Sequence, residues 1–117
     1  MRERRRSDQE RVRLMLRAAG EARPYLDRWG GHYDDPETPY FRQGLWALVY
    51  QFVESTDRVS EAFKAANPAV PWALYRRFRF EMARDYPEVS PGRVFAFARD
   101  AILPAVPKLR RARFPKG

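Results

Sequence analysis

The longest helical pattern of the chain, PYFRQGLWALVYQFVESTDRVSEAFKAA, spans residues 39–66. Its apolar side chains recur at steps of three and four, which is the spacing of residues on one helical face. Two neighbouring faces are apolar, one with Leu45, Leu48, Phe52, Val59 and Phe63, the other with Trp46, Val49, Tyr50 and Val53. A helix that is apolar over so wide an arc is buried on several sides. We therefore expect it to pack on its own bundle and on a second copy of the chain.

A first helix is predicted before this stretch. Ser7 and Glu10 form a capping box, in which each side chain can satisfy a free backbone N–H near the helix start. Pro24 lies within the pattern that follows and should kink the helix or end it, and Gly30 and Gly31 stop it.

Two further helices are predicted after it. The third should begin at Pro71 and close near Arg84, with Trp72 and Tyr75 in the core. The fourth should begin at Ser90 and Pro91, and the prolines at 104 and 107 should break or kink it.

These patterns predict an all-α protein, because no alternating strand pattern competes with them. The simplest architecture is an up-and-down bundle of four to five helices. We assign residues 7–107 to a single helical-bundle domain, residues 1–6 to a basic N-terminal tail and residues 108–117 to a basic C-terminal tail. A core of this size is modest, so a homodimer would be a natural way to bury more surface.

The net charge of +8 lies wholly in the two ends. Residues 1–6 carry +3, residues 108–117 carry +5, and the acids and bases between them cancel. Two interpretations remain open: the tails are solvated and aid solubility, or they touch polyanions such as nucleic acid.

Several classes of chemistry find no support in the sequence. The absence of cysteine excludes disulfides and thiol-based catalysis or metal sites. His32 is the single histidine and lies among loop acids, so we expect no metal and no cofactor. Phosphate-loop, dinucleotide-binding and hydrolase motifs are absent. The longest apolar run, residues 45–50, is far short of a membrane span, and no signal core follows the N-terminus, so we expect a cytoplasmic protein without membrane association.

From residue 43 onward the chain resembles the HepT-like family of the HEPN superfamily. The motifs that carry the resemblance are Gln43-Gly44-Leu45, Asn67-Pro68-Ala69-Val70-Pro71-Trp72, the segment RFEMARDY at 79–86, Val89-Ser90-Pro91-Gly92-Arg93-Val94-Phe95 and Asp100-Ala101-Ile102-Leu103-Pro104. The resemblance implies a homodimer in which two copies of an arginine–histidine motif form a metal-independent ribonuclease site. It also implies a toxin whose antitoxin is a minimal nucleotidyltransferase that adds AMP to a tyrosine of the motif.

By position, Arg79 matches the arginine of the motif and Tyr86 the tyrosine open to AMPylation, whereas Phe80 replaces a frequent asparagine and Arg84 replaces the histidine. Arginine stays charged at neutral pH and cannot act as a general base. It can hold phosphate through paired hydrogen bonds. The resemblance therefore implies RNA or nucleotide-phosphate binding by Arg79 and Arg84, with Arg76 nearby, and weak cleavage or none.

Other interpretations of the same residues stay open. Arg79 and Arg84 could be ordinary surface charges near a helix end, where cations favour the helix dipole, and Tyr86 could be structural. The protein could equally be a non-catalytic, substrate-presenting subunit of a nucleotidyltransferase, or a basic helical protein that binds nucleic acid nonspecifically through its tails.

Overall fold

The computed structural model describes residues 7–29, 39–84 and 89–115, and within these ranges every regular element is a helix. The all-α prediction is thereby confirmed. The elements are α1 (Asp8–Trp29), α2 (Pro39–Asp57), α3 (Glu61–Ala66), α4 (Trp72–Arg84), α5 (Pro91–Phe97), a π-helix (Ala98–Ile102), a 3-10 turn (Leu103–Ala105) and α6 (Val106–Arg110). None of the helices in these ranges is both long enough and apolar enough to cross a membrane.

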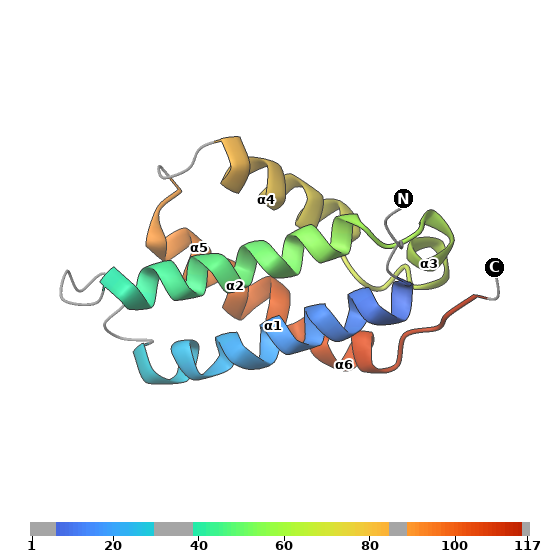
Figure 1. The fold of residues 1–117 in the computed structure, drawn as a ribbon, viewed down its shortest axis with the longest axis horizontal. Coiled ribbons are helices and arrows are strands. Elements are labelled where there is room, and N and C mark those ends of the chain that lie inside the picture. Colours follow the sequence, from blue (N-terminus) through green and yellow to red (C-terminus); the bar gives the residue numbers. More distant parts are fainter. Residues whose placement is uncertain (1–6, 30–38, 85–88, 116–117) are drawn as a thin grey trace, which may run out of the picture.

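Helix α2 lies at the centre of the bundle (Figure 1), with α1 on one side and α4 and α5 on others. The wide apolar arc explains this position, because Leu45, Val49, Phe52 and Val53 are all buried in one continuous core. The predicted burial of this helix within its own bundle is confirmed. Its packing on a second copy stays a prediction.

The prediction of one helix over residues 39–66 is wrong, because α2 ends at Asp57 and α3 begins at Glu61. Ser60 caps α3 by accepting a hydrogen bond from the backbone N–H of Phe63 at 3.1 Å. Asp8 accepts two more bonds from Ser60, from the backbone N–H at 2.8 Å and from the hydroxyl at 2.7 Å. The apolar spacing continues across the break and therefore did not reveal it. Asp8, at the start of α1, stabilises the break through its two hydrogen bonds with Ser60.

The predicted starts of the first and fourth helices are confirmed by their caps. Ser7 Oγ accepts a hydrogen bond from the backbone N–H of Glu10 at 3.1 Å, and Ser90 Oγ accepts one from Arg93 at 3.3 Å. Helix α1 continues past Pro24 to residue 29, so this proline does not end it.

The fourth helix changes its winding where a break or kink was predicted. After α5 it widens into the π-helix and then tightens into the 3-10 turn that holds Pro104. Tyr75 of α4 reaches this region and donates its hydroxyl to the carbonyl of Ala101 at 2.6 Å. The buried Tyr75 on α4 thus provides a hydrogen-bond donor for a backbone carbonyl of the π-helix.

Of the two interpretations left open for the basic C-terminal tail, a freely solvated tail does not describe residues 108–115. Leu109 is buried, so α6 is part of the core, and the segment after it is attached to the loop between α3 and α4 through Asn67 and Arg113. The basic segment therefore packs on the bundle over the residues that the structure describes.

Candidate functional site

Two of the three predicted phosphate-binding arginines share a carboxylate. Arg76 and Arg79 are three residues apart on α4 and so lie on one face of the helix. Arg76 Nε is 3.6 Å from Asp57 Oδ1, and Arg79 Nη1 is 3.7 Å from Asp57 Oδ2. Asp57 is the last residue of α2, so the packing of α2 on α4 brings the three charges together, with a local balance of one positive charge.

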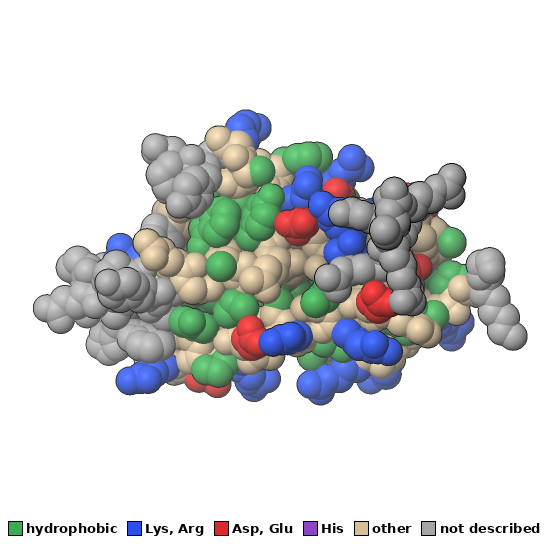
Figure 2. All heavy atoms as spheres, in the orientation of Figure 1, with side chains coloured by type: hydrophobic (Ala, Val, Ile, Leu, Met, Phe, Trp, Pro, Cys, Tyr) green, Lys and Arg blue, Asp and Glu red, His purple; other side chains and the backbone are tan. Residues whose placement is uncertain are grey.

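An exposed aromatic ring lies beside the same two guanidinium groups. The guanidinium carbon of Arg76 is 5.5 Å from the ring centroid of Phe80, and that of Arg79 is 5.6 Å away. Phe80 is 48% exposed, although it is a large apolar residue. We call Arg76, Arg79, Phe80 and Asp57 the Arg–Phe surface. Figure 2 shows basic and acidic side chains gathered where α4 lies over the end of α2.

Asp57 satisfies Arg79 only in part. The contact of 3.7 Å is long for a charge-assisted hydrogen bond. Arg79 Nε is buried and has no hydrogen-bond partner among the residues that the structure describes. An unsatisfied buried donor costs about 1–3 kcal/mol. The buried Nε–H is out of reach of a ligand, so a phosphate oxygen would have to pair with the exposed part of the guanidinium, whose contact to Asp57 is long.

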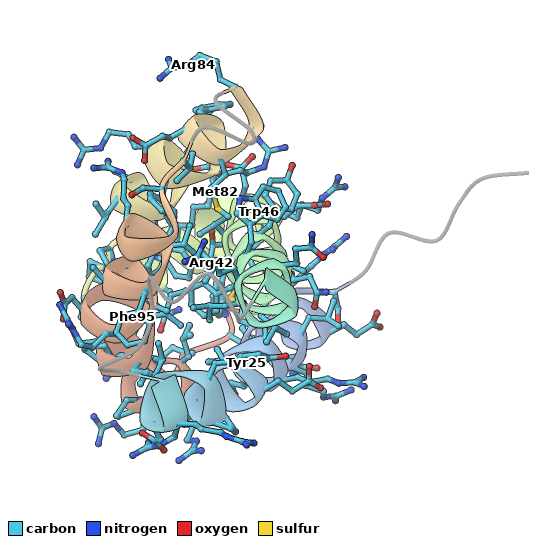
Figure 3. The ribbon with its side chains drawn as sticks, turned by 90° about the vertical axis from the view of Figure 1, so that its left-hand side faces the viewer. Tyr25, Arg42, Trp46, Met82, Arg84 and Phe95 are labelled. Atoms are coloured by element: carbon cyan, nitrogen blue, oxygen red, sulfur yellow. The ribbon has the colours of Figure 1, made fainter. Side chains whose placement is uncertain are left out.

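Arg84 lies apart from Arg79. Five residues along a helix correspond to a rotation of about 140°. Arg84 lines the groove between α4 and α5, and Figure 3 shows its side chain pointing away from the bundle at the end of α4. Within one chain the structure brings Arg76 and Arg79 together and does not add Arg84 to them. Tyr86 and His32 lie outside the described residues.

The groove that Arg84 lines is open and largely apolar, with a volume of about 860 Å³. Its floor includes the rings of Phe78 and Phe97, stacked 3.9 Å apart. An ion pair between Arg93 Nε and Glu81 Oε2, 2.7 Å long, lies at its wall. Such a groove can take apolar side chains, and it adjoins the Arg–Phe surface because Phe80 also lines it.

At the far end of the groove, Arg99 donates two hydrogen bonds to Asp100, and these bonds hold the pKa of Asp100 below its ordinary value. A carboxyl group held ionised in this way is a poor proton donor. No cluster of three or more histidine, cysteine or acidic side chains exists in the described part of the chain.

The Arg–Phe surface can stack a planar base and pair with phosphate, but it holds no imidazole. Asp57 is its one carboxylate, and both oxygens of that carboxylate face arginines. The arginines could be predicted from the sequence, whereas Asp57 and the ring of Phe80 were not predicted as parts of the same site. No local signal could reveal Asp57, because it belongs to a different helix.

No family model matches the chain, and neither a curated protein nor a solved structure matches it.

Proposed function

We propose that the protein binds single-stranded RNA or nucleotide phosphates through the Arg–Phe surface, and that it is a toxin-type protein of the HepT-like class whose ribonuclease motif has degenerated. The observation that carries the binding proposal is the exposed ring of Phe80 beside the guanidinium groups of Arg76 and Arg79.

The physical basis is the pairing of an aromatic face with fixed cations. Stacking of a base on an aromatic side chain contributes about 1–3 kcal/mol and tolerates any sequence, since every base has a π face. Arginine adds paired hydrogen bonds to phosphate. Both contributions arise from one turn of α4.

Binding without efficient cleavage follows from the residue at position 84. Arg84 stands where the family has its histidine, and it lies about 140° around α4 from Arg79. Cleavage of RNA through its 2′-hydroxyl requires a group that can take up and release a proton near neutral pH. The cations of α4 stabilise negative charge but do not move protons.

We also propose that a protein partner docks in the groove beside Phe80. The groove beside Phe80 exposes Leu74 as well, and an apolar groove with charged walls suits a protein partner. This supports a homodimer, a minimal nucleotidyltransferase antitoxin, or the alternative of an accessory subunit that presents substrate to such an enzyme. Leu74→Glu tests it, because a subunit contact through the groove should weaken and sedimentation analysis should then report monomers; an unchanged mass would remove the groove from the interface.

The binding experiment uses fluorescence anisotropy with a labelled single-stranded RNA of about 20 nucleotides, longer than a typical single-strand binding site. Each phosphate contact to a single strand contributes about fivefold at 0.1 M salt, given a slope of about 0.7 per contact. Arg76→Gln with Arg79→Gln should therefore weaken binding about 25-fold, and Phe80→Ala should weaken it about fivefold or more.

The matched control is Arg17→Gln with Arg23→Gln on α1, which removes the same charge from two exposed ion pairs. Equal losses in the control and in the α4 variant would show that net charge alone drives binding. Unchanged binding of the α4 variants would remove the proposal.

A further inference from the structure

The basic segment at the end of the chain is a fixed arm on the bundle. Between residues 106 and 115 it carries four cations and no acid, namely Lys108, Arg110, Arg111 and Arg113. We call these four residues the basic pole.

Three contacts fix the backbone of the arm. The side-chain amide of Asn67 donates to the carbonyl of Arg113 at 2.8 Å, and its oxygen accepts the N–H of Arg113 at 2.8 Å. The ring of Phe114 lies 5.1 Å from that of Phe63, a fully buried core residue. A solvated tail would need none of these contacts. The arginines of the arm are therefore presented from a backbone of defined conformation.

Three of the four cations of the pole line a small pocket at the turn after α3. The pocket has a volume of about 270 Å³, and its lining includes Lys108, Arg111 and Arg113 but no carboxylate. Lys108 Nζ donates to the carbonyl of Ala69 at 3.2 Å. The side chains of Arg110, Arg111 and Arg113 have neither an ion pair nor a hydrogen bond to any described residue.

This lack of acids sets the pole apart from other cationic parts of the surface. Arg17, Arg23 and Arg58 each pair with an acid one turn away, whereas no acid among the described residues forms an ion pair with a cation of the pole. A cluster of fixed, unpaired cations is favoured where an anion occupies it.

The two ends of the described chain are both held at α3. Asp8 contacts Ser60 at the N-cap of α3, and Arg113 contacts Asn67 at its C-cap. The described chain thus begins and ends at the same end of the bundle (Figure 1).

We propose that the basic pole is a second nucleic-acid contact, at which the arm follows the phosphate backbone and the pocket of Lys108, Arg111 and Arg113 takes one phosphate. Three of the four cations are arginines, which bind phosphate through paired donors. A membrane surface fits less well, because interfacial helices expose a broad apolar face. Here α6 buries Leu109, and Phe114 is the one large apolar residue that the described arm exposes. This contact does not depend on the Arg–Phe surface.

The test compares full-length Arg111→Gln with Arg113→Gln against wild type, with labelled single-stranded RNA over a range of salt concentrations. Loss of two phosphate contacts should reduce the slope of log K against log salt by about 1.4 and weaken binding about 25-fold at 0.1 M salt. The control is again Arg17→Gln with Arg23→Gln. An unchanged slope in the pole variant, or an equal change in the control, would overturn the proposal.

The variant Asn67→Ala tests whether binding needs the arm to be fixed on the bundle, and it leaves the net charge unchanged. It should weaken RNA binding about threefold or more, because the arm loses its preorganised conformation, whereas a loose tail predicts no change. Circular dichroism checks that Asn67→Ala retains the helices. If it does not retain them, the variant with Arg111→Gln and Arg113→Gln decides whether the basic pole binds RNA. The same variants are titrated with inorganic phosphate and with phosphatidylserine vesicles. Binding to vesicles but not to RNA would also overturn the proposal.

The two RNA contacts can fail separately. If the Arg76 and Arg79 variant alone abolishes binding while the pole variant behaves as wild type, the pole is wrong and the proposed function stands. The reverse pattern would leave the pole as the RNA contact and remove the Arg–Phe surface.

Discussion

Replacing Asp57 with asparagine should strengthen RNA binding while it weakens the fold. The carboxylate of Asp57 lies 3.6 Å from Arg76 and 3.7 Å from Arg79, so it neutralises half of their charge. Asparagine has nearly the same shape and keeps an oxygen that can accept a hydrogen bond, but it carries no charge. The variant Asp57→Asn therefore frees one positive charge on the surface that we propose binds phosphate.

The gain in affinity follows from counterion release. One further phosphate contact to a single strand increases the salt slope by about 0.7, which corresponds to about fivefold tighter binding at 0.1 M salt. The gain should shrink as salt is added, because the whole effect is electrostatic.

The loss of stability follows from the unequal burial of the two arginines. The side chain of Arg76 is 63% exposed, so its ion pair contributes little. The side chains of Arg79 and Asp57 are each only 24% exposed, so their pair is screened less by water. We expect Asp57→Asn to lower the free energy of unfolding by about 1 kcal/mol.

The assay combines anisotropy titration with labelled RNA and urea unfolding of the same preparations. Glu21→Gln is the control, since it removes one acid from an exposed ion pair with Arg17 and changes the net charge equally. RNA binding of Asp57→Asn that is unchanged or weaker would refute the reasoning. A fivefold gain in the control as well would refute it too, because the effect would then be one of net charge.

Three further predictions concern stability and are measured by urea unfolding. Burial raises the pKa of the Tyr75 hydroxyl above its ordinary value of about 10, so its contribution to the free energy of unfolding is complete below about pH 10 and is lost as the pH rises beyond it. Tyr75→Phe should lower the free energy of unfolding by about 1 kcal/mol at neutral pH and reduce the loss of stability in alkali. A methyl group at Gly44 would lie 2.6 Å from the hydroxyl of Tyr25. Gly44→Ala should therefore cost more in the wild type than in a Tyr25→Phe background, and equal costs would contradict this account. Asp8→Ala removes both hydrogen bonds to Ser60 and should cost about 2 kcal/mol, with a cost near zero counting against its role in the helix break.

Helix starts could be predicted from the sequence because the chemistry of a cap is local. Ser7 and Ser90 each accept a hydrogen bond from a backbone N–H three residues later, and both lie next to clear apolar patterns. The buried faces of α2 and α4 follow from the same periodicity, as the complete burial of Phe52 and Tyr75 illustrates.

The remaining features depend on residues that are distant in sequence. The break between α2 and α3 depends on Asp8, which precedes Ser60 by 52 positions. The Arg–Phe surface depends on Asp57, which precedes Arg76 in the sequence and lies at the end of a different helix. The attachment of the basic arm depends on Asn67. Single-sequence patterns report which faces are apolar, and they do not report which polar groups meet once the helices pack.

The most direct test of the central claim, that the protein binds RNA without cleaving it, measures binding and cleavage in the same sample. End-labelled single-stranded RNA is incubated with saturating protein and a metal chelator, and samples are divided between anisotropy and a denaturing gel. Wild type should bind the RNA and leave it full-length, and in a parallel titration Phe80→Ala should bind it about fivefold more weakly or worse. Cleavage by wild type that Arg79→Ala abolishes would contradict the account, because a general base would then operate where arginine stands.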